Sequence, residues 1–83
     1  MNNTRPIIVE HYRKINKLKY MRTIRRISQT ELSLKSGIPL KCIGNYEQGR
    51  RDLNHARVDI IYRLSEALNC SIYDLLDIDE ISK

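Results

Sequence analysis

The sequence predicts a compact all-α domain of five short helices, and three observations support this prediction. Apolar residues recur at three- to four-residue spacing along most of the chain, which is the period of a helix rather than of a strand. Residues that cap helices interrupt this pattern at intervals. The length of 83 residues allows one modest core and leaves no room for a second large domain.

The first helix is predicted over residues 16–26, where apolar side chains recur about every three residues. Its stripe comprises Ile15, Leu18, Met21, either Ile24 or Arg25, and Ile27. Residues 1–15 precede it and are expected to form an arm, an extension of the helix or a disordered start. Residues 16–78 are expected to form the domain, and residues 79–83 an acidic tail.

The second helix is predicted to begin after Ser28 and to run to about Ser36. Ser28 and Glu31 have the spacing of a capping box, in which each side chain bonds the other residue's backbone amide. Gly37 follows at the position where a left-handed residue ends many helices. Pro39 cannot extend this helix but is tolerated at the start of the next one.

The third helix is therefore predicted over residues 39–48, with Ile43 and Tyr46 on its inner face and Gly49 at its end. After a polar loop, Asn54 is expected to cap a fourth helix over residues 55–68. The inner face of that helix holds Ile61, Leu64 and Leu68, flanked by Val58 and Ala67.

Asn69 is suited to the left-handed position after the fourth helix. Ser71 and Asp74 then resemble a second, weaker capping box. A short fifth helix is expected to begin there and to reach about Asp77.

The positive charge is concentrated near the start of the chain. Fifteen Lys and Arg residues outnumber ten Asp and Glu residues, for a net charge of +5. Residues 1–27 contain eight of the basic residues and one acid. This asymmetry predicts either a surface that faces a polyanion or a solvated, lysine-rich helix face.

Other function classes are not favoured by the sequence. No apolar run approaches the length of a membrane span, so we expect a cytoplasmic protein. The two cysteines and two histidines lack the spacing of a metal site, and no nucleophile is paired with a histidine base. We therefore expect no enzyme activity, no metal and no cofactor.

The second and third helices have the spacing of a helix-turn-helix unit, in which two helices flank a short turn that contains glycine. In the window that opens at Gln29, Gly37 is the ninth residue and the small Ser33 is the fifth. Leu32, Ile38 and Ile43 supply the apolar side chains that seal the junction between the two helices.

In these residues the sequence resembles the phage-repressor and Cro-like, or XRE-type, helix-turn-helix proteins. The likeness runs from Leu18 to Leu76 and includes the segments Ser28-Gln29-x-Glu31-Leu32, Ser36-Gly37-Ile38 and Ile43-x-x-Tyr46-Glu47-x-Gly49. It implies a compact five-helix, lambda-repressor-like domain whose third helix enters the major groove of double-stranded DNA.

The resemblance also implies roles for individual residues. Arg22 and Glu47 match a structural ion pair between the first and third helices. The expected DNA contacts are Gln29, Leu40, Lys41, Gly44, Asn45, Gln48, Arg50, Arg51, Asn54 and Arg57. Pro39, Leu40 and Gly44 depart from the family pattern, and these departures bear on base specificity more than on DNA binding.

We therefore expect a sequence-specific transcriptional regulator of the repressor type that binds DNA as a homodimer. The candidate dimer contacts are Leu75, Leu76, Ile78 and Ile81. The alternative is an antitoxin-like autoregulator that binds a partner toxin, through residues 1–15 or 72–83, as well as its own operator. A partner that copurifies with the chain would distinguish this alternative.

Overall fold

The computed structural model describes residues 16–77, and predictions for residues 1–15 and 78–83 lie outside this range. The described residues form four α-helices: α2 (Lys17–Ile24), α3 (Gln29–Ser36), α4 (Leu40–Glu47) and α5 (Val58–Leu68). Two 3-10 turns accompany them, η1 (Leu53–His55) and η2 (Ile72–Asp74). The predicted all-α class is confirmed.

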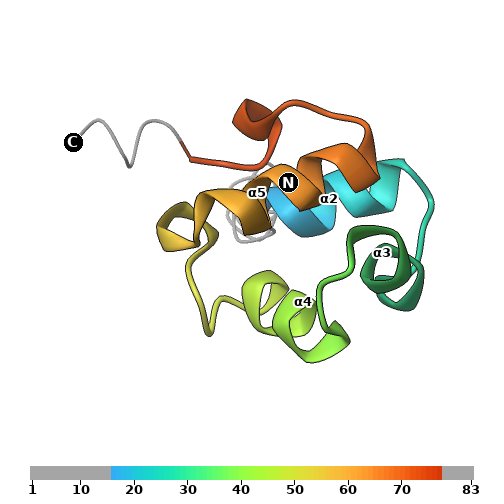
Figure 1. Cartoon of the computed structure of the whole chain (residues 1–83), viewed down its shortest axis with the longest axis horizontal. Coiled ribbons are helices and arrows are strands. Elements are labelled where there is room, and N and C mark those ends of the chain that lie inside the picture. The colour runs from blue at the N-terminus through green and yellow to red at the C-terminus, as the bar shows by residue number, and fades with distance from the viewer. Residues whose placement is uncertain (1–15, 78–83) are drawn as a thin grey trace, which may run out of the picture.

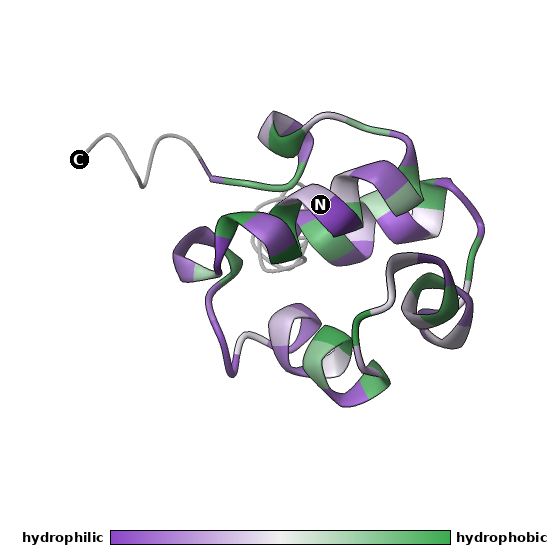
Figure 2. Ribbon diagram, viewed as in Figure 1, coloured by the Kyte–Doolittle hydropathy of each residue, from purple (hydrophilic) through white to green (hydrophobic). Residues whose placement is uncertain are grey.

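The helices surround one core. Figure 1 shows α5 across the middle of the molecule, α4 on one side of it and η2 on the opposite side. α3 packs against both α4 and α5, while α2 contacts α4. Figure 2 shows hydrophobic and hydrophilic residues interspersed along each of these helices. The fully buried side chains are Leu18, Leu32, Ile38, Ile43, Leu64 and Leu68.

Three of the predicted helix ends are confirmed. The Ser28 hydroxyl accepts a hydrogen bond from the Glu31 amide at 3.0 Å, although the returning bond of the predicted capping box is not formed between these two described residues. Gly37 ends α3 with φ of 75°, and Asn69 ends α5 with φ of 53°. Both residues adopt the left-handed conformation that their residue types tolerate.

The first helix ends two residues earlier than predicted. Arg25 caps α2, and Arg26 turns the chain with φ of 59°. This turn brings Ile27 against the core, so the last position of the predicted stripe is filled from outside the helix. Ile24 is exposed, and the Arg25 guanidinium instead reaches the carbonyl groups at the end of α5.

The prediction that Asn54 caps a helix starting at residue 55 was wrong. The Asp52 side chain caps η1, Leu53 turns into the core, and α5 begins at Val58 after Arg57. Val58 is exposed rather than beside the inner face. Ala56 and Arg57 have extended backbone conformations between η1 and α5, so these two elements do not form one continuous helix.

The predicted fifth helix is a single 3-10 turn, η2. Its capping box between Ser71 and Asp74 is present. Leu75 and Leu76 follow and are both buried, with 3% and 8% of their surfaces exposed. Two consecutive residues point in different directions on a helix, so ending the helix allows both leucines to enter the core.

This burial corrects part of the predicted dimer interface. Leu75 and Leu76 fill the core of a single copy and offer no free apolar surface to a second one. Ile78 and Ile81 lie outside the described residues. No helix within residues 16–77 is long and apolar enough to cross a membrane.

Candidate nucleic-acid interface

α4 has one buried face and one exposed face. Ile43 and Tyr46 point into the core, with exposed fractions of 0% and 5%. Pro39 precedes the helix and provides no side-chain cap. The residues on the outward face are Leu40, Lys41, Gly44, Asn45 and Gln48, which recur at the three- to four-residue spacing of one helical side. We call these five residues the α4 outer face.

The helix-turn-helix junction is closed as predicted. Leu32, Ile38 and Ile43 are each at most 1% exposed. The Ser33 hydroxyl donates to the Ile38 carbonyl at 2.6 Å across the turn. A small polar side chain at this position therefore lets the two helices approach and also satisfies a backbone group of the turn.

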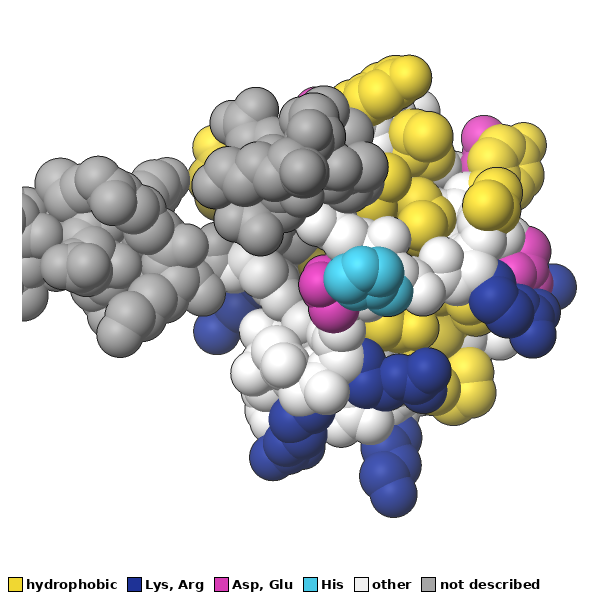
Figure 3. All heavy atoms as spheres, turned by 90° about the vertical axis from the view of Figure 1, so that its left-hand side faces the viewer, with side chains coloured by type: hydrophobic (Ala, Val, Ile, Leu, Met, Phe, Trp, Pro, Cys, Tyr) yellow, Lys and Arg dark blue, Asp and Glu magenta, His cyan; other side chains and the backbone are white. Residues whose placement is uncertain are grey.

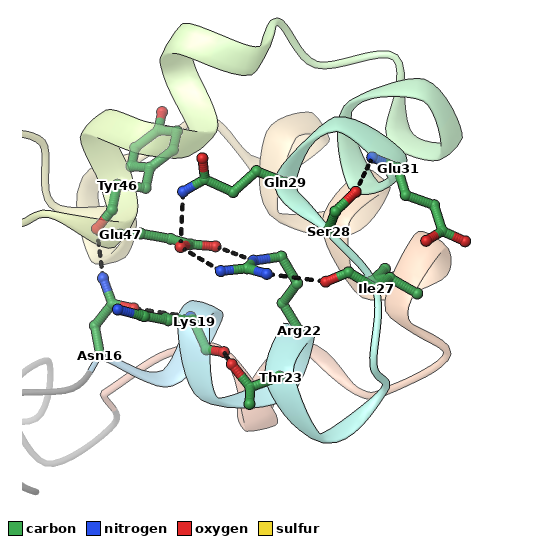
Figure 4. A network of polar contacts seen from close by, with 10 residues as sticks. All are labelled: Asn16, Lys19, Arg22, Thr23, Ile27, Ser28, Gln29, Glu31, Tyr46 and Glu47. Atoms are coloured by element: carbon green, nitrogen blue, oxygen red, sulfur yellow. Dashed lines mark hydrogen bonds and ion pairs between the residues drawn. The ribbon is translucent and has the colours of Figure 1, made fainter.

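A partly buried polar network fixes α4 to α2 and α3 (Figure 4). Arg22 of α2 donates to both carboxylate oxygens of Glu47, at 2.6 and 3.0 Å. Gln29 of α3 donates to the same carboxylate at 3.0 Å. The expected Arg22–Glu47 ion pair is thus present, and Gln29 braces the same carboxylate.

This network also controls the charge near the α4 outer face. The Glu47 side chain is only 2% exposed, and Arg22 also donates to the Ile27 carbonyl at 2.9 Å. The hydrogen bonds to Glu47 raise the pKa of the Arg22 guanidinium, although burial acts in the opposite direction. Arg22 therefore neutralises an acid that would otherwise repel a polyanion at this end of α4.

Asn16 forms a second link to α4, which the sequence analysis missed. Its side-chain oxygen caps α2 by accepting from the Lys19 amide at 2.9 Å. Its side-chain nitrogen donates to the Tyr46 carbonyl in the last turn of α4. An asparagine just before an apolar helical stripe is a recognisable cap, but its second bond depends on how the helices pack.

The α4 outer face contains side chains that the protein itself leaves available. Lys41 and Gln48 are exposed and have no side-chain hydrogen-bond partner within residues 16–77. Leu40 is 46% exposed. A Cβ atom placed on Gly44 would meet no atom within 4 Å, so the surface above this glycine is open.

Two arginines follow α4 and extend its positive surface. The Arg50 guanidinium donates to the Asn45 side-chain oxygen at 3.4 Å. The Arg51 guanidinium lies over the Tyr46 ring, 5.7 Å from its centroid. Figure 3 shows Lys and Arg side chains protruding at the end of the molecule where α4 lies in Figure 1.

Two of the expected DNA contacts, Asn54 and Arg57, have hydrogen-bond partners within the protein. Asn54 donates to the Asp77 carbonyl at 3.3 Å and accepts from the Asp77 amide at 2.9 Å, which ties η1 to the end of the described chain. Arg57 donates twice to Asp59, at 3.0 and 2.7 Å. These hydrogen bonds raise the pKa of Arg57 and lower the pKa of Asp59.

Two basic residues, Lys17 in α2 and Arg25 at its C-cap, form hydrogen bonds that stabilise the fold. Lys17 donates to the carbonyl groups of Leu76 at 2.8 Å and Tyr73 at 3.3 Å. Arg25 donates to the carbonyl groups of Leu68 and Asn69 at the end of α5. Cations are favourable at the C-terminal end of a helix. Lys17 therefore holds the segment that follows η2, and Arg25 holds the end of α5. Neither charge belongs to the surface around α4.

The comparison with known proteins agrees with this geometry. A family model described as helix-turn-helix matches residues 18–75, a range that contains all six described elements except the first residue of α2. No curated protein and no solved structure matches the chain. The matched family consists of DNA-binding transcription regulators rather than enzymes. The chain belongs to the XRE and Cro-like helix-turn-helix family.

Proposed function

We propose that this protein is a sequence-specific repressor that reads the major groove of double-stranded DNA with the α4 outer face. The observation that carries the proposal is the contrast between the two sides of α4. One side is fixed by core packing and by the Arg22–Glu47–Gln29 network. The other side presents side chains with few hydrogen-bond partners within the protein. A rigid helix with available polar side chains is what a DNA-binding surface requires.

The residue types of the α4 outer face fit the edges of bases. Lys41 is a donor suited to the N7 and O6 acceptors of guanine, and Asn45 can pair with the N6 and N7 atoms of adenine. The exposed Leu40 side chain fits the methyl group of thymine. Gly44 allows the backbone of α4 to approach the base edges closely.

Contacts to the sugar-phosphate backbone are proposed for the surroundings of α4. Gln48, at the end of the α4 outer face, supplies hydrogen-bond donors, as do Arg50 and Arg51 in the loop that follows. Gln29 keeps one amide hydrogen beyond the one it gives to Glu47. Arg57 would have to exchange Asp59 for a phosphate, and Asn54 would have to leave Asp77, so these two contacts are expected to contribute least.

Repression follows from occupancy of the DNA. A domain that fills the major groove at a site overlapping a promoter excludes RNA polymerase without any additional contact. We propose that two copies bind together, with half-sites about 34 Å apart on one face of the duplex. Sedimentation of the protein with and without a palindromic site measures this stoichiometry, and one copy per palindrome would contradict the proposed dimer.

Base reading is tested with alanine variants on a binding site selected from random DNA. Lys41→Ala and Asn45→Ala are each expected to cost about 1–3 kcal/mol on that site and to relax selectivity at one base position. Lys19→Ala is the matched control, because it removes an exposed lysine from α2 rather than from α4. Unchanged selectivity in both α4 variants would refute the groove assignment.

A nonspecific basic binder gives a different result in the same assay. Random-sequence competitor DNA would then displace the protein from the selected site as effectively as the site itself. Transcription from a promoter that overlaps the site tests repression, and an increase in transcript would assign activation instead.

The antitoxin-like function stays a prediction. Its expected partner-binding segments, residues 1–15 and 72–83, lie largely outside the described residues. Purification of the protein from its native host, followed by identification of any stoichiometric partner, tests it.

A further inference from the structure

The chain turns sharply after α4, and this turn brings Arg50 beside the α4 outer face. Gln48 caps the helix, and Gly49 adopts φ of 79°. The amides of Arg50 and Arg51 then both donate to the Asn45 carbonyl, at 2.9 and 3.2 Å. The start of the loop is therefore fixed to the backbone of the residue proposed to read adenine.

The side chains of the two arginines serve different contacts. Arg50 donates from its guanidinium to the Asn45 side-chain oxygen at 3.4 Å. Arg51 instead places its guanidinium over the Tyr46 ring. Arg50 is thus the arginine of this pair whose side chain contacts the α4 outer face.

We propose that Arg50 is a positioning residue for Asn45. A guanidinium has donors and no acceptor, so it favours the orientation in which the asparagine amide presents its oxygen to Arg50. The amide nitrogen is then directed to the other side. Because a carbonyl oxygen has two lone pairs, the Asn45 oxygen keeps one for a second donor.

This orientation matches what adenine requires. The base offers a donor at N6 and an acceptor at N7, so an asparagine must present its oxygen and nitrogen in one fixed order. An amide that is already oriented loses less rotational freedom on binding. Arg50 therefore contributes to base discrimination as well as to charge. This inference rests on the proposed reading of DNA by α4.

The test measures discrimination, defined as the ratio of affinities for the selected site and for the same site changed at the base that Asn45 reads. Arg50→Ala is expected to lower this ratio about three- to tenfold, as the loss of one hydrogen bond implies. In an Asn45→Ala background, Arg50→Ala is expected to lower it no further. Arg50→Lys is expected to recover the affinity for both sites but only part of the ratio, because an ammonium also donates to the Asn45 oxygen but lacks the fixed planar geometry of the guanidinium.

Arg51→Ala is the matched control and is expected to weaken binding to the selected site and to the changed site by the same factor. If Arg50→Ala also weakens binding to both sites by the same factor, Arg50 acts through charge alone and the proposal is overturned. Failure of the proposed function is distinguishable, because Asn45→Ala alone would then leave the ratio unchanged. The side-chain amide resonances of Asn45 in the DNA-free protein test the contact separately. They are expected to shift in Arg50→Ala and not in Arg51→Ala, and unshifted resonances in Arg50→Ala would overturn it.

Discussion

The substitution Gly44→Ala, which adds one methyl group, is expected to change the stability of the protein and its affinity for DNA in opposite directions. It lies inside α4, where glycine costs about 1 kcal/mol relative to alanine because it loses more backbone freedom on folding. A Cβ atom at this position would meet nothing within 4 Å, and Gly44 is not among the residues with positive φ. Neither packing nor backbone conformation in the free protein requires glycine here.

Gly44→Ala is therefore expected to raise the free energy of unfolding by about 0.8–1 kcal/mol. For a domain of this size, that gain corresponds to an increase in Tm of about 4–8 °C. Circular dichroism during thermal and urea unfolding measures both quantities. Affinity for the selected DNA site is expected to fall at least about tenfold, because in the proposed complex the new methyl group would occupy the closest approach between α4 and the bases.

Gly37→Ala is the matched control for stability. The space around Gly37 is equally open, but its φ of 75° places an alanine in the left-handed region, at a cost of about 1–2 kcal/mol. The same substitution thus has opposite signs at the two positions. A destabilised Gly44→Ala protein would refute the helix argument, and a stabilised protein that binds DNA as well as the original would refute close contact between α4 and DNA.

Two further predictions concern the anchoring network and the cysteines. Glu47→Gln is expected to cost about 2–4 kcal/mol in urea unfolding, because it leaves the Arg22 guanidinium without its buried counter-charge. A loss below about 0.5 kcal/mol would mean that the pair behaves as an exposed one. Burial raises the pKa of the Cys70 thiol, with a smaller contribution from Asp74 in the same direction. In a Cys42→Ser protein, the alkylation rate of Cys70 is therefore expected to reach half its maximum at a higher pH when folded than in urea, and equal midpoints would contradict this.

The sequence by itself determined where most of the helices lie. Ser28, Gly37 and Asn69 act through bonds and backbone conformations within a few residues, so their patterns predict helix ends without knowledge of the fold. The apolar spacing likewise identified Leu32, Ile38 and Ile43 as the closed junction. Because these signals are local, the helix-turn-helix unit was recognisable before any helix was placed in space.

Only the tertiary structure decided which long polar side chains remain available for DNA. Asn54 was expected to cap a helix and to contact DNA, yet its side chain holds the Asp77 backbone, and Lys17 of the basic N-terminal part holds the carbonyl group of Leu76. The two members of each of these pairs are far apart in sequence. The spacing of apolar residues does not predict which distant segments come into contact when the helices pack. The same is true of Leu75, whose place in the core depends on where the chain turns after α5. Net charge therefore described the whole molecule, while packing determined which of its charges face outward around α4.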